Sequence, residues 1–187
     1  MSDSRGEIEF VRPRSSHNAT VYLADSDPAW AHQYVELAAL IRQALGDHVA
    51  SVEHVGSTSV PGLAAKPIID IMLLLVDPTD EAAYVPHLEE AGFLLHLRER
   101  GWHEHRLLRG TNPAANLHVF AVGSPEAERL LLFRDRLRSS LEDRDLYERS
   151  KRELAGRQWA HVQDYADAKS SVVEEIIARA RLDPPRP

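Results

Sequence analysis

The spacing of apolar residues changes along the chain and divides it into two parts. Short apolar runs at 20–24, 50–55, 68–76, 93–98, 102–109 and 117–122 predict strands, separated by turns that contain glycine and proline. Helical spacing predicts helices at 29–45 and 79–91 between these strands, and at 125–139, 142–156 and 161–182 after them. The pattern indicates an α+β fold: a small mixed β-sheet with helices, followed by C-terminal helices that close a cleft.

The same pattern predicts how the chain is organised. Residues 1–18 are polar and are expected to be flexible, and residues 183–187 form a proline-rich tail. Residues 19–182 are expected to fold as a single domain, with a mixed-sheet core to about residue 123 and C-terminal helices at 124–182. The longest apolar run, at 68–76, is far shorter than a membrane span, so no membrane partner is expected.

Composition excludes several classes of function. The chain has 187 residues and no cysteine, which excludes disulfides, thiolate catalysis and cysteine zinc sites and is compatible with a cytoplasmic protein. Its formal net charge of -7 argues against general nucleic-acid binding. A local phosphate site remains compatible with an acidic chain, because the field at a site depends on the arrangement of nearby charges.

The segment from His54 to Asp70 has the densest candidate chemistry. Gly56 lets the backbone approach a ligand closely, and the three hydroxyl residues Ser57, Thr58 and Ser59 follow it. Hydroxyls and free backbone N–H groups in such a turn suit phosphate oxygens. The same residues also make an ordinary turn, so the segment alone leaves both interpretations open.

Asp70 lies inside an apolar run that reads as a buried strand. An unpaired buried carboxylate is costly and needs a metal, a cation or several hydrogen-bond donors. Asp70 is therefore either a structural residue paired with an arginine or a loop, or a metal-ligating or catalytic carboxylate at the edge of a cleft. Lys66, four residues earlier, is either its partner, a phosphate-binding cation or simply solvated.

Cations also lie on the inward faces of the predicted C-terminal helices. Lys169 shares an apolar stripe with Val162, Tyr165, Val173 and Ile176, and Lys151 shares one with Tyr147 and Leu154. Arg134 flanks the stripe of Leu130, Phe133 and Leu137 in the same way. These cations either make structural ion pairs with nearby acidic residues or form a rim that faces phosphate.

The stretch EHVGSTSVPGLAAKPIIDIML, at 53–73, resembles the signature of the GrpB family, which belongs to the polymerase-beta-like nucleotidyltransferase superfamily. The likeness continues at 116–119, 131–138, 151–155 and 165–169, and spans about residues 21–177. It implies a small mixed sheet with helices of nucleotidyltransferase type. It also implies a Gly-Ser pair that holds a triphosphate, an Asp-x-Asp/Glu pair that binds two Mg²⁺ ions, and a third carboxylate on a later strand.

Carried over to this sequence, Gly56-Ser57 matches the first motif and Asp70 the first carboxylate, while Met72 replaces the second. The strand of the third carboxylate offers His118. These departures weaken the inference of two-metal catalysis, and the residues present are chemically compatible with a site for one metal, Mg²⁺ with Mn²⁺ as the alternative, held by Asp70 with His54 or His118 as ligand or base. Either histidine also has an ordinary interpretation as a hydrogen-bonded structural residue, and the pair His103 and His105 on a predicted hairpin is more often coincidence than a zinc site.

Two functions follow from these residues and the resemblance. In the first, the chain binds a nucleoside triphosphate with Mg²⁺ and transfers a nucleotidyl group to an unknown hydroxyl acceptor, with Asp70 and His54 as the catalytic pair. In the second, it is a non-catalytic nucleotide-binding or partner-stabilising domain, like the GrpB-like domains fused to dephospho-CoA kinases. Whether the chain is an enzyme stays open between the two. The expected phosphate-binding residues are Gly56, Ser57, Thr58, Ser59, Lys66, Arg134, Lys151 and Lys169.

Overall fold

The computed structural model describes residues 8–12, 22–156 and 168–183. Six strands form one sheet in the order β1-β4-β5-β6-β3-β2. β3 and β6 pair in parallel, and the other neighbours pair antiparallel, so the predicted mixed sheet of an α+β fold is confirmed. The strands are β1 (Glu9–Phe10), β2 (Ser51–Val55), β3 (Ile69–Leu75), β4 (Leu94–Glu99), β5 (His105–Thr111) and β6 (Ala114–Ala121).

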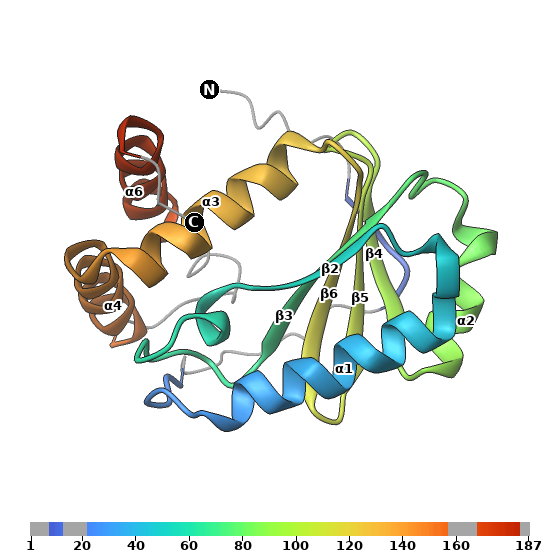
Figure 1. Cartoon of the computed structure of the whole chain (residues 1–187), viewed down its shortest axis with the longest axis horizontal. Helices are drawn as coiled ribbons and strands as arrows, with labels where there is room; N and C mark the ends of the chain where they lie inside the picture. Colours follow the sequence, from blue (N-terminus) through green and yellow to red (C-terminus); the bar gives the residue numbers. More distant parts are fainter. Residues whose placement is uncertain (1–7, 13–21, 157–167, 184–187) are drawn as a thin grey trace.

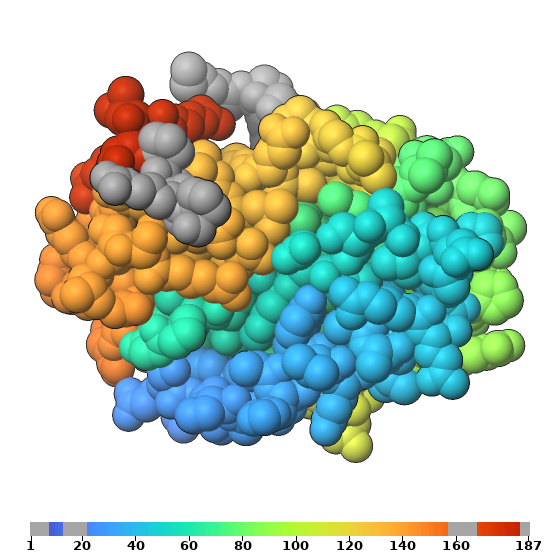
Figure 2. All heavy atoms as spheres, viewed as in Figure 1, coloured from blue at the N-terminus to red at the C-terminus, as the bar shows by residue number. Residues whose placement is uncertain are grey.

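Helices cover both faces of this sheet (Figure 1). They are α1 (Ala29–Leu45), α2 (Val85–Glu90), α3 (Pro125–Ser139), α4 (Leu141–Ala155) and α6 (Ser170–Leu182), with short 3-10 turns η1 (Gly46–His48), η2 (Ser57–Ser59) and η3 (Glu81–Ala83). α1 and α2 pack on one face, and α3 packs on the other beside α4 and α6. α1 and the C-terminal helices are both visible at the surface of the same view (Figure 2). Among the helices of the described residues, none combines the length and apolar composition needed to cross a bilayer.

Alternation along β3 decides which side chains meet on each face. Ile69, Ile71 and Leu73 belong to the main core under α1 and α2. Asp70 and Met72 face the side of α3, where Met72 packs with Val55 and Phe120. Asp70 pairs with Val55 of β2 and Asn116 of β6, so these three side chains share one face.

The sequence predicted some elements well and others poorly. α1 and α3 begin and end where expected, and the Asp27 carboxylate accepts a hydrogen bond from the Ala29 N–H at 2.9 Å. The helix expected at 79–91 is instead the turn η3 followed by the short α2. The expected helix is interrupted at Tyr84, which is buried and donates a hydrogen bond from its hydroxyl to the Pro78 carbonyl at 2.9 Å.

Two further expectations changed at the edges of the described residues. The strand expected at 20–24 is an isolated bridge between Ala24 and Ala65, with residues 20 and 21 outside the described range. The last helix is described from Ser170, so Val162 and Tyr165 of its expected stripe also lie outside that range.

Part of the N-terminal segment, expected to be flexible throughout, joins the sheet. Glu9–Phe10 forms β1 on β4, and the Glu9 carboxylate lies 2.6 Å from the Arg98 guanidinium. Backbone pairing and this ion pair hold residues 9 and 10 in place, although an exposed ion pair contributes only about 1 kcal/mol or less.

The C-terminal helices are fastened to one another by a buried carboxylate. Asp143 of α4 accepts from Arg136 of α3 and Arg179 of α6, each at 2.6 Å. Arg138 of α3 donates to the Ser59 carbonyl at 2.9 Å, and the Lys151 amine of α4 donates to the Ala64 carbonyl. These contacts hold the three helices against the segment from Ser57 to Lys66, which follows β2.

Candidate functional site

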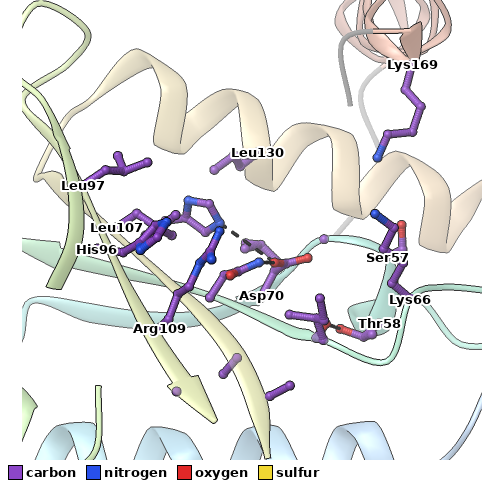
Figure 3. Close-up of a pocket in the computed structure, with 18 of the residues that line it drawn as sticks. Ser57, Thr58, Lys66, Asp70, His96, Leu97, Leu107, Arg109, Leu130 and Lys169 are labelled. Atoms are coloured by element: carbon purple, nitrogen blue, oxygen red, sulfur yellow. Dashed lines mark hydrogen bonds and ion pairs between the residues drawn. The ribbon is translucent and has the colours of Figure 1, made fainter. Parts of the chain in front are cut away.

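A cavity of about 750 Å³ lies on the α3 side of the sheet (Figure 3). Its floor is formed by neighbouring strands, and its walls come from the 55–70 segment, α3, α4 and Lys169. Its lining includes eight of the predicted site residues: Gly56, Ser57, Thr58, Lys66, Asp70, His118, Lys151 and Lys169.

Gly56 and Asp70 lie close together in the lining of the cavity. A Cβ atom on Gly56 would lie 2.3 Å from one Asp70 carboxylate oxygen and 2.8 Å from the Asp70 Cβ. Gly56 also has a φ of 68° and a ψ of -173°, a conformation that only glycine adopts readily. The absence of a side chain at position 56 therefore allows the Ser57 turn to sit against the Asp70 carboxylate.

Asp70 opens into the cavity instead of being buried as the sequence suggested, since 30% of its side chain is exposed. The Asn116 amide donates to Asp70 Oδ1 at 2.9 Å, and His118 Nε2 lies 3.9 Å from the same oxygen. None of the described arginines makes an ion pair with Asp70. This environment differs from the structural aspartate–arginine pair that was the alternative.

Three amines gather at one end of the cavity. Lys66, Lys151 and Lys169 are the only lysines in the chain, and all three line this cavity, whereas the other 19 basic residues are arginines. In Figure 3 the Lys169 amine points toward Ser57 and Lys66. A positive cluster therefore faces the Gly56–Ser57 turn in a protein whose net charge is -7.

Burial and mutual repulsion act on these amines. Burial lowers the pKa of all three lysines, and the charge of Lys169 further lowers the pKa of Lys66 and Lys151. The pKa of Lys151 falls to about 7. The Lys151 amine also lies 4.7 Å from the centre of the Tyr147 ring, a cation–π contact. An anion in the cavity would favour the charged form of each amine.

The hydroxyls of the 57–59 turn have different roles. Ser57 lines the cavity, and its side chain contacts Tyr147, a buried phenol whose pKa is raised by burial to about 12. Thr58 also lines the cavity, but its hydroxyl donates to the Ile68 carbonyl at 3.2 Å. Ser59 donates to the Gly56 carbonyl at 2.7 Å and is not part of the lining, so its expected contact with phosphate does not fit its position.

His54 is not brought to the cavity. It pairs with Ile71, so it faces α1 on the opposite side of the sheet from Asp70. Its ring stacks on Tyr34 at 4.6 Å, its Nε2 lies 3.1 Å from the Thr58 hydroxyl, and burial lowers its pKa to about 4. The expected role of His54 as ligand or base is therefore corrected: it is a neutral residue that supports the turn from behind.

Arg134 is also outside the cavity lining. Its guanidinium binds the Glu53 carboxylate at 2.9 Å and the Asp135 carboxylate at 2.7 Å, and donates to the His54 carbonyl. The expected phosphate contact is replaced by the structural ion pairs that were its alternative. They tie α3 to β2.

Sequence reasoning missed a row of hydrogen-bonded groups that ends at His118. Glu99 Oε2 lies 2.7 Å from His105 Nδ1, and His105 Nε2 lies 3.1 Å from His118 Nδ1. His105 is buried, and burial lowers its pKa to about 4. The sequence placed His105 on an exposed hairpin, but β5 is an inner strand between β4 and β6.

The far end of the cavity has a different lining, which the sequence did not predict. Across the sheet, His118 is level with Leu107, Leu97 and Phe10 in turn. His96 and Arg109 stand beside this row, and the His96 ring meets Phe10 edge-on at 6.0 Å. The cavity thus has three amines near Ser57, and near Phe10 it has an apolar row flanked by His96 and Arg109.

Comparison with known proteins identifies the family of the chain. The family model described as GrpB protein matches residues 20–179. The chain belongs to the GrpB family. A UPF0157 protein of Halalkalibacterium halodurans is 53% identical over 88% of this chain and 84% of its own length. The crystal structure of conserved protein GrpB from Enterococcus faecalis superposes with a TM-score of 0.72 at 28% identity, covering 84% of this chain and 98% of that one.

A more distant similarity connects this GrpB protein with a larger enzyme. A dephospho-CoA kinase of Mycolicibacterium paratuberculosis is 28% identical over 89% of this chain. The matching region is 47% of that kinase, so the likeness covers part of it.

The donors in this GrpB cavity fit one divalent cation better than two. β3 has a single carboxylate, Asp70, because position 72 is a methionine. Met72 is fully buried among Val55, Phe120 and Ala127. Within the described ranges no group of three or more histidine and acidic side chains is arranged to hold a metal. Asp70 and His118 offer one carboxylate and one imidazole side by side, so a single ion held there would need its remaining ligands from water or a bound ligand.

The contact between Gly56 and Asp70 predicts the effect of adding one methyl group. Gly56→Ala is expected to lower the free energy of unfolding by at least about 1–3 kcal/mol through backbone strain alone, with a steric cost added to it. Urea denaturation measures the loss. Gly62→Ala is the matched control, because Gly62 also has a positive φ, 79°, but no atom lies within 4 Å of its added Cβ. Equal losses in the two variants would contradict a tight Gly56–Asp70 contact.

The buried Lys151 predicts a pH dependence of stability. Its pKa is about 7 in the folded protein and near its ordinary value of 10.5 when unfolded. Between these values the unfolded state binds more protons, so stability rises with pH, by at most about 1.4 kcal/mol per pH unit. Below pH 7 the contribution is constant and unfavourable. Lys151→Met should reduce the slope of stability against pH when urea unfolding is measured from pH 7 to 9.5, leaving the smaller contributions of Lys66 and Lys169, whereas Arg149→Met, on the exposed side of α4, should leave the slope unchanged.

Proposed function

We propose that this cavity binds a nucleoside triphosphate together with one divalent cation and transfers its nucleotidyl group to a hydroxyl acceptor. The observation that carries the proposal is the convergence of all three lysines on one wall, beside the Gly56–Ser57 turn and across from Asp70. The phosphates bind between these amines and the turn. The cavity volume of about 750 Å³ is within the usual range for small-ligand sites.

The energetics of the lysine end support an anionic ligand. Three amines from separate segments are kept partly out of water and repel one another, which is unfavourable in the empty protein. A polyphosphate supplies several negative oxygens to the same space and relieves that repulsion. Lysine suits such a site because its ammonium group is a compact charge that contacts phosphate from many directions.

Asp70 and His118 are the residues that would hold the cation, Mg²⁺ or Mn²⁺, next to the phosphates. A cation there supplies charge neutralisation for the phosphate oxygens and fixes their orientation. Asn116 keeps one Asp70 oxygen in place, and Gly56 leaves room for a ligand to approach the carboxylate. The apolar end near Phe10 and Leu107 then accommodates the base or the acceptor.

A second candidate is a nucleotide-binding domain without transfer activity. Two observations favour it: Met72 occupies the position of the second carboxylate, and His54 faces away from the cavity. The likeness to part of a dephospho-CoA kinase is compatible with a helper role of such a domain. Both candidates share the phosphate site and differ only in whether pyrophosphate is released.

The lysines provide a direct test of phosphate binding. Reductive methylation with ¹³C retains their charge and labels only three side chains and the amino terminus. A nucleoside triphosphate with Mg²⁺ or Mn²⁺ should shift all three lysine signals, and at ~100 times its dissociation constant should raise the free energy of unfolding by about 2.7 kcal/mol. Release of pyrophosphate on adding a hydroxyl acceptor supports transfer, and binding without release supports the second candidate. Unshifted lysine signals with every common nucleoside triphosphate would refute both.

Asp70→Asn separates a metal-binding aspartate from a structural one. The asparagine can still accept the Asn116 hydrogen bond, so urea denaturation should show a loss of no more than about 1 kcal/mol. Metal-dependent nucleotide binding should disappear, while weak metal-free binding at the lysines persists. Asp145→Asn, an exposed change of the same charge, serves as the control. A loss of about 3–5 kcal/mol with nucleotide binding intact is the signature of a broken buried ion pair and would make Asp70 structural.

A further inference from the structure

Glu99, His105 and His118 form a hydrogen-bonded row on three neighbouring strands, β4, β5 and β6. Glu99 and His105 are buried, whereas 27% of the His118 side chain is exposed at the cavity. The row therefore has a closed end under Trp102 and Phe120 and an open end beside Asp70.

A purely structural role explains this row poorly. Glu99 and His105 lie on an otherwise apolar part of the sheet face, where His105 stacks on Phe120 at 4.7 Å. Burying polar groups there is costly even when they are paired, and apolar side chains of similar size would fill the space at lower cost. The row runs from the buried Glu99 to His118, which lies at the cavity beside Asp70.

The hydrogen bonds determine where the protons lie. The Glu99 carboxylate only accepts, so His105 donates from Nδ1. A neutral imidazole has one N–H group, so His105 Nε2 accepts from His118 Nδ1. In the neutral form of His118 the lone pair is then on Nε2, and this atom faces the cavity 3.9 Å from Asp70 Oδ1.

We propose that Glu99 and His105 are positioning residues that hold His118 Nε2 as a nitrogen ligand beside Asp70, so that the site selects Mn²⁺ over Mg²⁺. This inference rests on the proposed function for the presence of a cation in the cavity. Mg²⁺ favours a shell of oxygens, whereas an imidazole ligand strengthens binding of transition metals. A histidine ligand is held in one tautomer and orientation when its second nitrogen is hydrogen-bonded to a carboxylate, or to a group that is itself hydrogen-bonded to a carboxylate.

The tautomer is measured first, on the metal-free protein. ¹⁵N NMR of labelled histidine should show His118 protonated at Nδ1 and unprotonated at Nε2. The double variant Glu99→Leu with His105→Phe replaces the buried polar pair by apolar residues of similar size and retains the ring packing, so it is expected to fold. In that variant His118 should lose its single tautomer. A wild-type His118 that carries its proton on Nε2 would overturn the proposal.

Metal binding is measured next, with Mn²⁺ or Mg²⁺ as the only ligand, by titration calorimetry and by the electron paramagnetic resonance of free Mn²⁺. The wild-type chain should bind Mn²⁺ more tightly than Mg²⁺. The double variant should lose about ten- to a hundredfold in Mn²⁺ affinity, with Mg²⁺ affinity little changed. His118→Asp should move the preference toward Mg²⁺, and His103→Gln, on the exposed turn before β5, should behave as wild type.

The two proposals fail in different ways. Equal affinity of the wild-type chain for Mn²⁺ and Mg²⁺, or an unchanged Mn²⁺ affinity in a folded double variant, overturns the positioning role while lysine shifts with nucleotide remain. Absence of those lysine shifts, with Mn²⁺ binding that still depends on His105, overturns the nucleotide proposal and supports this one.

Discussion

The close approach of the Gly56 backbone to the Asp70 carboxylate is the contact on which the cavity depends. β2 and β3 pair up to Val55 and Asp70, and the chain then turns at Gly56 over the carboxylate instead of away from it. This places Ser57 on the cavity wall and allows the rest of the segment to reach α4, where Lys151 binds the Ala64 carbonyl. A side chain at position 56 would separate the turn from Asp70 and so displace the 55–70 segment that forms part of the cavity wall.

Arginines and lysines have largely different surroundings in this protein, although Arg109 also lines the cavity. Arginines make the structural ion pairs, such as those of Arg136 and Arg179 with the buried Asp143, because a planar guanidinium matches a carboxylate in a fixed geometry. The three lysines are confined to the cavity, where burial lowers the pKa of each. An acidic chain thereby keeps a local positive field at one end of one site. The net charge of -7 argues against general nucleic-acid binding but carries no information about this cluster.

The outcome for individual residues shows what sequence periodicity can and cannot predict. The spacing along β3 and the C-terminal helices was enough to bring Asp70, Lys151 and Lys169 toward one site, and α1 and α3 begin and end where expected. The prediction that His54 is a ligand or base in the site was wrong, because the face on which His54 lies depends on the register of β2 with β3. That register pairs Val55, not His54, with Asp70. The prediction that His105 lies on an exposed hairpin was wrong, because the order of strands in a sheet is a tertiary property. In the folded protein β5 lies between β4 and β6.

The row that ends at His118 also bears on the missing carboxylate. Met72 lies level with His118 across the β3–β6 pair, and it packs against Val55, Phe120 and Ala127. An aspartate at position 72 would have to enter that apolar cluster, where a charge is unfavourable. The neighbouring strand offers a nitrogen ligand instead, and Glu99 supplies negative charge behind it through His105. If the cavity holds one cation as proposed, His118, whose carboxylate partner Glu99 lies two strands away, would take the place of the second anionic ligand that the nucleotidyltransferase resemblance implies.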